Sequence, residues 1–178
     1  HSQTKLKGCY LIELDKLLDD RGCFVKTFNK DFFLKHNMRF DFEEEYYTVS
    51  KKNVLRGFHF QLPPHDHAKL VSCIKGSVMD VVVDLRQGSL TFGEFEIIEL
   101  NSDNPKAVYI PSGMAHGFYT RSNEAIMNYN VTSMYSPSHE CGIKWDSINV
   151  DWPKKSPILS KRDHLFQSLG DFNSPFII

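Results

Sequence analysis

The stretch that decides the fold reads Val54-Leu55-Arg56-Gly57-Phe58-His59-Phe60-Gln61. Its branched and aromatic residues are typical of a β-strand, yet it carries an arginine and a histidine. Because side chains alternate along a strand, Arg56 is expected on one face and His59 on the other, unless a β-bulge intervenes. Charged groups in such a strand indicate a ligand site. The alternative is a hydrogen-bonded core histidine beside a surface ion pair.

Short β-rich segments continue from residue 46 to about 132, without a helical period long enough for a crossover. In segment 78–85, the odd-numbered residues Met79 to Leu85 are apolar and share one face, whereas Asp80 and Asp84 make the other face polar. This pattern predicts an all-β fold, an antiparallel sandwich or barrel. The other expected strands are 54–60, 69–75, 92–100, 107–110, 117–120 and 125–132.

Helices are expected to be short and peripheral, at 30–36 and at about 160–169. Ser160 suits the N-cap of the second helix, with an acidic residue, Asp163, three positions later. This pattern alone gives Asp163 a structural explanation. No repeat or linker divides the chain, so we expect a single domain over residues 1–178.

Composition excludes several classes of function. The 178 residues carry a formal charge of −1 with acidic and basic residues interspersed, so no basic stripe for nucleic acid is expected. The four cysteines form no C-x-x-C pair, which argues against a zinc site and for reduced thiols in the cytoplasm. No apolar run is long enough for a membrane span, and the start has no signal-peptide pattern.

Two histidine motifs resemble those of the cupin barrel, in which three His and one Glu often hold a metal. They are His65-Asp66-His67 and Pro111-Ser112-Gly113-Met114-Ala115-His116. The Glu expected after the first motif is missing, because Val71 and Ser72 stand there, and the first motif follows Pro63-Pro64 in an expected exposed turn. We therefore expect no metal and no other cofactor, while the second motif supports a barrel.

An ordered series of motifs resembles the dTDP-4-dehydrorhamnose 3,5-epimerase family over roughly residues 10 to 165. The series comprises Leu55 to Gln61, Lys69-Leu70-Val71, Asp80 to Arg86, Ser89 to Gly93, Ile110 to Phe118 and Tyr129 to Trp145. The resemblance implies a cupin-type jelly-roll barrel without a metal, acting on a nucleotide-linked 4-keto sugar. It also implies a homodimer, to which the segment of about 1–45 contributes.

The resemblance assigns catalytic roles to four residues of this sequence. His59 resembles the general base, Asp163 its orienting carboxylate, Tyr129 the general acid on the opposite face of the sugar, and Lys69 the group that stabilises an enolate. These types suit the chemistry, because a ketone at C4 acidifies the hydrogens on C3 and C5. We expect a carboxylate partner to raise the histidine pKa toward neutrality.

The resemblance also assigns substrate-binding roles. Arginine suits the diphosphate because its guanidinium pairs with phosphate in a bidentate manner, and tyrosine suits stacking on the base. Each of these tyrosines has an alternative role in ordinary sheet packing. The expected binding residues are Arg21, Glu44, Arg56, Gln61, His116, Tyr135, Glu140 and Arg162.

Two stretches depart from the family pattern. Arg21-Gly22-Cys23-Phe24-Val25-Lys26 ends in a lysine where the family has a glutamate, and Glu44-Glu45-Tyr46-Tyr47-Thr48 replaces Gln-x-Asn-x-Ser. A carboxylate such as Glu44 can accept hydrogen bonds from N1–H and the 2-amino group of guanine. We therefore consider GDP beside dTDP, and a GDP-linked 4-keto-6-deoxy-heptose as the leading specific substrate.

Three other functions stay open from the sequence. A metal-dependent cupin oxygenase or isomerase would contain metal and be sensitive to chelators. A nucleotide-sugar ketoisomerase would shift the carbonyl between C3 and C4. A binding protein that only kept the barrel would not need the four catalytic residues. Whether one or two stereocentres invert is not decided by the sequence, because the same acid and base serve either outcome.

Overall fold

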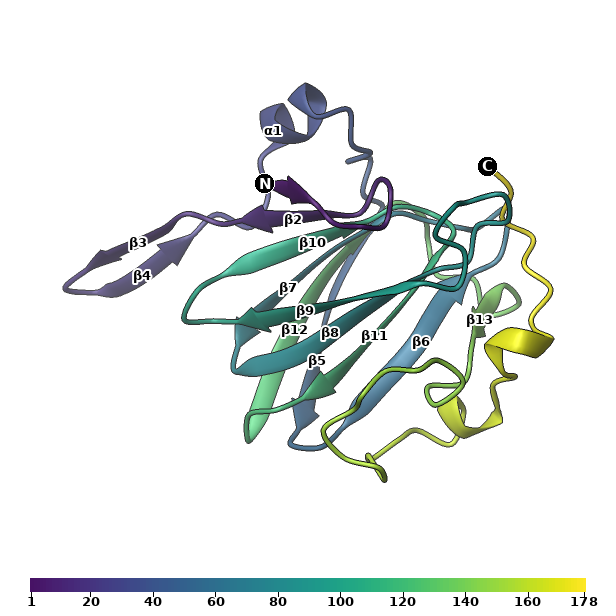
Figure 1. Ribbon diagram of the computed structural model, residues 1–178. Helices are drawn as coiled ribbons and strands as arrows, with labels where there is room; N and C mark the ends of the chain where they lie inside the picture. Colours follow the sequence, from purple (N-terminus) through teal and green to yellow (C-terminus); the bar gives the residue numbers. More distant parts are fainter.

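The computed structural model describes residues 1–178 and contains two large antiparallel sheets that face each other (Figure 1). The all-β jelly-roll prediction is confirmed. The six-stranded sheet has the order β1 (Ser2–Gln3), β2 (Tyr10–Glu13), β10 (Lys106–Ile110), β7 (Lys69–Lys75), β12 (Glu124–Val131) and β5 (Glu44–Lys51). The five-stranded sheet has the order β13 (Glu140–Gly142), β6 (Leu55–Gln61), β11 (Met114–Thr120), β8 (Ser77–Asp84) and β9 (Phe95–Asn101).

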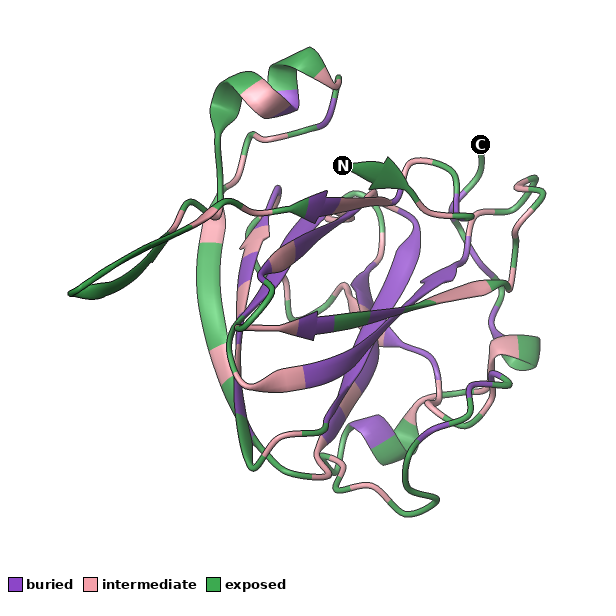
Figure 2. Cartoon of the chain, turned by 60° about the vertical axis from the view of Figure 1, so that its left-hand side comes forward, coloured by how far each residue is buried: buried purple, intermediate pink, exposed green.

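The alternation of β8 is confirmed, and each of its faces meets a different layer. Val78 and Val82 belong to a cluster of 15 buried residues that fills the space between the sheets. Met79, Val81 and Val83 belong to a second cluster on the outer face, which the C-terminal segment covers. Figure 2 shows the buried strands at the centre of the barrel, surrounded by exposed loops. A strand buried on both faces anchors the sheet that carries the functional groups.

The outer face of the six-stranded sheet is covered by α1 (Lys30–Lys35). Asn29 caps the helix, because its side chain accepts hydrogen bonds from the backbone N–H groups of Asp31 and Phe32. Phe33 is buried and joins a third, smaller cluster against the sheet. This helix confirms the expected helix at 30–36.

The expected helix at 160–169 is wrong: two 3₁₀ turns, η1 (Asp163–Leu165) and η2 (Leu169–Asp171), stand in its place. Ser160 Oγ does accept the backbone N–H of Asp163, at 3.1 Å. Phe166 then adopts an extended backbone and ends the turn. The carboxylate of Asp163 is turned toward the barrel, so its role is more than that of a cap.

A β-bulge in β6 places Arg56 and His59 on the same face. His116 of β11 pairs with His59, and Phe118 pairs with Arg56, so two residues of β6 oppose one of β11. Gly57 has a φ of +131°, and a Cβ there would lie 2.5 Å from the Cα of Gly117. The expected placement of Arg56 and His59 on opposite faces is therefore wrong. The reason is the β-bulge, which was the stated exception to strict alternation.

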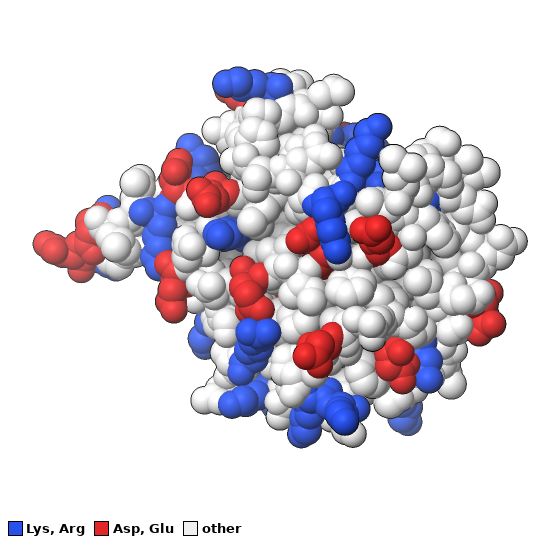
Figure 3. All heavy atoms as spheres, viewed as in Figure 1, with Lys and Arg blue, Asp and Glu red and all other residues white.

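A two-stranded hairpin of β3 (Lys16–Asp19) and β4 (Gly22–Val25) projects away from the barrel (Figure 1). Charged side chains of both signs are mixed over the face shown in Figure 3. No helix in the structure is long and apolar enough to cross a lipid bilayer.

Candidate active site

A cavity of about 350 Å³ lies inside the barrel, between the two sheets. Its size falls within the range of roughly 300–1,000 Å³ that is typical of small-molecule sites. Strands β6 and β11 supply one wall, and β5, β7 and β12 supply the other. Eleven of the twelve predicted site residues line this cavity or, in the case of Asp163, contact a residue that does; the exception is Arg21.

His59 and Asp163 form a hydrogen-bonded pair across 104 positions of sequence. His59 Nε2 lies 2.8 Å from Asp163 Oδ1, and Asp163 Oδ2 accepts the backbone N–H of Gly57 at 3.4 Å. Only 2% of the Asp163 side chain is exposed, whereas 25% of the His59 side chain is. If Nε2 donates its proton to the carboxylate, Nδ1 is the basic nitrogen of the ring, and no protein group occupies it.

Burial controls the protonation of this pair. It lowers the pKa of His59, and the hydrogen bond and charge of Asp163 offset only part of that effect. The expectation that the carboxylate raises the histidine pKa is therefore wrong in its net sign, because desolvation of the imidazolium is larger. Burial also opposes the ionisation of Asp163, but the hydrogen bond and charge of His59, together with the hydrogen bonds from Ser160 and Gly57, outweigh it and lower the Asp163 pKa. At neutral pH the pair is a neutral imidazole beside a carboxylate.

Tyr129 reaches the same cavity from the facing sheet. It lies on β12, is 6% exposed, and its ring stacks on that of Tyr46, with centroids 4.8 Å apart and planes 15° apart. Burial raises the pKa of Tyr129 far above its usual value, so the phenol keeps its proton. A base on one wall and a protonated acid on the opposite wall are what inversion of a carbon centre needs.

Lys69 provides a buried positive charge between the two walls. It is 6% exposed, and its Nζ donates a hydrogen bond to the backbone carbonyl of His59 at 3.1 Å. Burial lowers its pKa to about 8. The ammonium is therefore still protonated at neutral pH, with hydrogens free to bind an oxyanion in the cavity.

Arg56 and His116 are both held in place by protein groups. Arg56 donates to Ser50 Oγ at 2.9 Å and to the backbone carbonyl of Val49, rather than forming a surface ion pair. His116 Nε2 lies 2.7 Å from Asp80 Oδ2, and both side chains are buried. The polar face of β8 is thus explained by a carboxylate that orients a cavity histidine.

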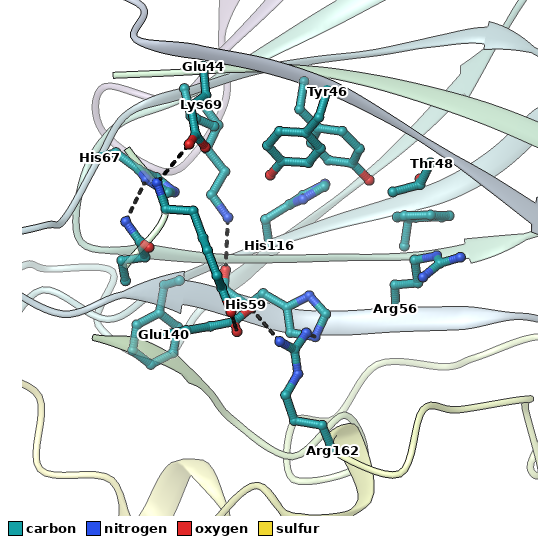
Figure 4. Close-up of a pocket in the computed structure, with 16 residues that line it drawn as sticks. Glu44, Tyr46, Thr48, Arg56, His59, His67, Lys69, His116, Glu140 and Arg162 are labelled. Carbon is teal, nitrogen blue, oxygen red and sulfur yellow. Dashed lines mark hydrogen bonds and ion pairs between the residues drawn. The ribbon is translucent and has the colours of Figure 1, made fainter. Parts of the chain in front are cut away.

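A hydrogen-bonded chain of charged residues borders the cavity. Glu140 accepts the hydroxyl of Tyr135 at 2.7 Å and forms an ion pair with Arg162. Glu44 Oε1 accepts the backbone N–H of Tyr135 at 3.0 Å, while its second oxygen forms no hydrogen bond or ion pair with the protein. Figure 4 shows Glu44, Lys69 and His67 grouped at one side of the cavity and Arg56 with Thr48 at the other.

Gln61 lines the cavity, but its amide is engaged by the protein. Its nitrogen donates to the backbone carbonyl of His65 at 2.8 Å, and its oxygen accepts the backbone N–H of Ser136 at 2.7 Å. These bonds hold the loop that carries Tyr135. The contact of Gln61 with substrate stays a prediction.

Arg21 does not reach the cavity of its own chain. It lies at the turn of the β3–β4 hairpin, where its guanidinium pairs with Asp19 at 2.5 Å and its side chain is 90% exposed. The expected contact of Arg21 with substrate is therefore absent within a single chain.

Six cavity residues were not predicted as site residues: the apolar Phe60, Phe118 and Val131, and three with polar groups, Tyr46, Thr48 and His67. Thr48 Oγ1 and His67 Nε2 are buried and have no hydrogen-bond partner, so a ligand in the cavity can pair with them. Strand alternation would have found Tyr46 and Thr48, since they share a face of β5 with Glu44. His67 was expected in an exposed turn, but it is half-buried, and burial lowers its pKa to about 3.

The cupin-like histidine motifs both reach the cavity but do not form a cluster of metal ligands. His116 is paired with Asp80, and the His67 ring contacts Ser133 Oγ at 3.0 Å. The structure contains no group of three or more His, Cys, Asp or Glu side chains arranged to hold a metal ion. The metal-dependent alternative therefore has no ligand set among the described side chains.

Comparisons with known proteins agree with this geometry. Residues 3–171 match the family model described as dTDP-4-dehydrorhamnose 3,5-epimerase. A dTDP-4-dehydrorhamnose 3,5-epimerase of Methanothermobacter thermautotrophicus is 38% identical over 174 residues, covering 95% of this chain and 94% of that protein. A dTDP-4-dehydrorhamnose 3-epimerase of Streptomyces niveus is 37% identical, covering 89% of this chain and 78% of that protein.

A solved structure gives the same result. The dTDP-6-deoxy-D-glucose-3,5-epimerase of Legionella pneumophila, in complex with dTDP-4-keto-L-rhamnose, superposes with a TM-score of 0.91 at 33% identity, covering 96% of this chain and 92% of that one. The family match spans nearly the whole chain, and the barrel places the imidazole of His59 and the phenol of Tyr129 on facing walls of one cavity. The chain therefore belongs to the dTDP-4-dehydrorhamnose 3,5-epimerase family and is an isomerase.

Proposed function

We propose that this protein inverts C3, C5 or both in a nucleoside-diphosphate 4-keto sugar, by removing and returning a proton through an enolate. The observation that carries the proposal is the placement of His59 and Tyr129 on facing sheets around one cavity. Nδ1 of His59 takes the proton from the carbon next to the ketone, and Asp163 holds the ring. Lys69 stabilises the negative charge on the C4 oxygen, and Tyr129 returns a proton to the opposite face.

Heavy-water exchange tests this reaction. Candidate 4-keto sugars linked to dTDP or GDP are incubated with the protein in D₂O, and deuterium at C3 and C5 is followed by NMR and mass. We expect His59→Ala to abolish exchange and inversion, and Tyr129→Phe to keep some exchange while inversion stops. His164→Ala, an exposed histidine in η1, is the matched control. Exchange at neither carbon with either nucleotide, or full turnover by His59→Ala, would refute the proposal.

The nucleotide is the second part of the proposal, and Glu44 supports guanine. Its side chain lines the cavity, and one carboxylate oxygen forms no hydrogen bond or ion pair with the protein. Guanine presents two adjacent donors, N1–H and the 2-amino group, whereas thymine presents one N–H between two carbonyls that a carboxylate repels. A GDP-linked 4-keto-6-deoxy-heptose is the corresponding substrate.

Calorimetric titration with GDP and dTDP tests this assignment. We expect GDP to bind more tightly, and Glu44→Gln to reduce that preference by about tenfold or more, since hydrogen bonds to charged groups contribute roughly 1.5–3 kcal/mol. The neighbouring Glu45→Gln, which faces outward, is the control. Tighter binding of dTDP by the unmodified protein would exclude the guanine assignment and leave the epimerase proposal untouched.

A homodimer is the third part, with residues 1–178 as one domain of each subunit. The β3–β4 hairpin exposes Leu17, Leu18 and Phe24, with 63%, 74% and 59% of their surfaces accessible. An isolated two-stranded hairpin with such an apolar surface is marginally stable, which supports its packing on a second copy. Arg21 would then contact the diphosphate in the partner's cavity. The four unpaired cysteines support a cytoplasmic location.

Complementation tests the dimer. Arg21→Ala and His59→Ala are each expected to have little activity as pure proteins, because every cavity lacks one of the two groups. After mixing and subunit exchange, about a quarter of the cavities combine a normal hairpin with a normal His59, so activity returns. Monomers in light scattering, or an active Arg21→Ala protein, would contradict this part.

A further inference from the structure

The hydroxyl of Tyr129 is held only weakly by polar contacts. The hydroxyl of Thr48 interacts with it and lowers its pKa against the larger effect of burial, yet Thr48 Oγ1 has no hydrogen-bond partner of normal geometry. A phenol that delivers a proton to one carbon needs a fixed direction, because a misplacement of about 1 Å in a reacting group can cost on the order of 10²-fold in rate. The direction of this phenol must therefore come mainly from the packing of its ring.

Two side chains determine where that ring lies. On one side Tyr46 stacks on it, with centroids 4.8 Å and planes 15° apart. The ring of His116 also lies against it, with planes at 67° and centroids 6.0 Å apart. His116 is itself fixed by Asp80, at 2.7 Å. The ring of Tyr129 thus packs against both a fixed imidazole and a second phenol ring.

The backbone brings Tyr46 to this position. Tyr46 and Tyr129 are direct cross-strand partners in the β5–β12 ladder, so their side chains leave the sheet on the same face. Tyr46 is 41% exposed, so it closes the cavity side of Tyr129 that solvent would otherwise reach. Partial burial raises the pKa of Tyr46 to about 12, which keeps the ring neutral. The asparagine that the family pattern has here offers no ring for stacking.

We infer that Tyr46 is a positioning residue that holds the phenol of Tyr129 toward the substrate and so favours proton return on the inverting face. The inference rests on the proposed function, in which Tyr129 is the acid and His59 the base. When Tyr46 is missing, the enolate still forms at His59. The enolate is then more often reprotonated from the His59 side, which regenerates substrate that carries deuterium but has not been inverted.

The partition of the enolate in D₂O measures this role directly. The measured quantity is the partition ratio, defined as deuterated, uninverted substrate divided by inverted product at early reaction times. Both species come from the same folded enzyme, so the ratio is independent of how much protein is active. We expect Tyr46→Ala to raise the ratio at least tenfold, and Tyr46→Phe, which keeps the stacked ring, to restore it to within about twofold of the unmodified protein.

A matched control is the adjacent residue Tyr47, which is 67% exposed on the other side of β5. Tyr47→Ala should leave the ratio unchanged. An unchanged ratio in Tyr46→Ala, or no rescue by Tyr46→Phe, would overturn the positioning role. Failure of the proposed function has a different signature, because the unmodified protein would then show no exchange, or Tyr129→Phe would leave the ratio unaltered.

Discussion

Replacing Lys69 by methionine should weaken catalysis and stabilise the fold. A pKa of about 8 against the usual 10.5 means that holding this charge inside the barrel costs about 3 kcal/mol. Methionine has a similar length without the charge, but it loses the hydrogen bond to the carbonyl of His59, which contributes about 1 kcal/mol. The net gain is about 2 kcal/mol, which for a domain of this size raises Tm by about 4–8 °C at pH 7.

The activity should change in the opposite direction. Removal of one preorganised donor to an oxyanion typically reduces kcat by about 10²–10³-fold. Circular-dichroism melts at pH 7 and deuterium exchange into substrate measure the two effects on the same samples. Lys75→Met is the matched control, because Lys75 lies on the same strand but is exposed and paired with Glu124, so both effects should be small.

Two results would refute this reasoning. If Lys69→Met lowers Tm and activity together, the lysine holds the barrel rather than the enolate. If Tm rises while kcat stays within about threefold, the charge contributes nothing to the reaction. The sign of the pH effect gives a further check. Lys69 loses its proton in the folded state above about pH 8 but in the unfolded chain only near 10.5, so its contribution to stability rises between these values in the unmodified protein and is absent from Lys69→Met.

Three further predictions concern the base and its support. Asp163→Asn should reduce kcat by about 10²–10⁴-fold. The N–H of Gly57 would hold the new amide oxygen, so the amide NH₂ would face His59 and force the tautomer in which Nδ1 is protonated and cannot act as a base. A loss of less than tenfold would contradict this reasoning. The pH profile of kcat/KM should fall on the acid side below the usual histidine pKa, since the pKa of His59 is lowered, and on the alkaline side near pH 8, where Lys69 loses its proton; an alkaline limb that persists in Lys69→Met would exclude that assignment. Gly57→Ala should destabilise the protein by about 3 kcal/mol or more in urea unfolding, because a Cβ at φ +131° meets the backbone of Gly117 at 2.5 Å, and unchanged stability would show that the bulge tolerates a side chain.

Most of the barrel follows from local patterns. The strands between residues 54 and 131 and the two faces of β8 are set by alternation of apolar and polar residues, which acts over neighbouring positions only. The short strands of the first 25 residues and β13 escaped prediction, because strands of two to four residues carry too few alternations to be recognised. The helix expected at 160–169 failed because Asp163 bonds to His59, a partner 104 positions away, instead of staying a local cap.

By itself, the sequence determined the all-β class, the family resemblance and the kinds of group in the site: imidazole, carboxylate, phenol, ammonium and guanidinium. Only the tertiary structure decided how they act. The bulge at Gly57 turned Arg56 and His59 to one face, and the register of β5 with β12 brought Tyr46 onto Tyr129. Burial then lowered the pKa values of His59 and Lys69 and raised that of Tyr129. The physical reason is that register and desolvation depend on the layers that cover a strand, and those layers come from distant parts of the chain.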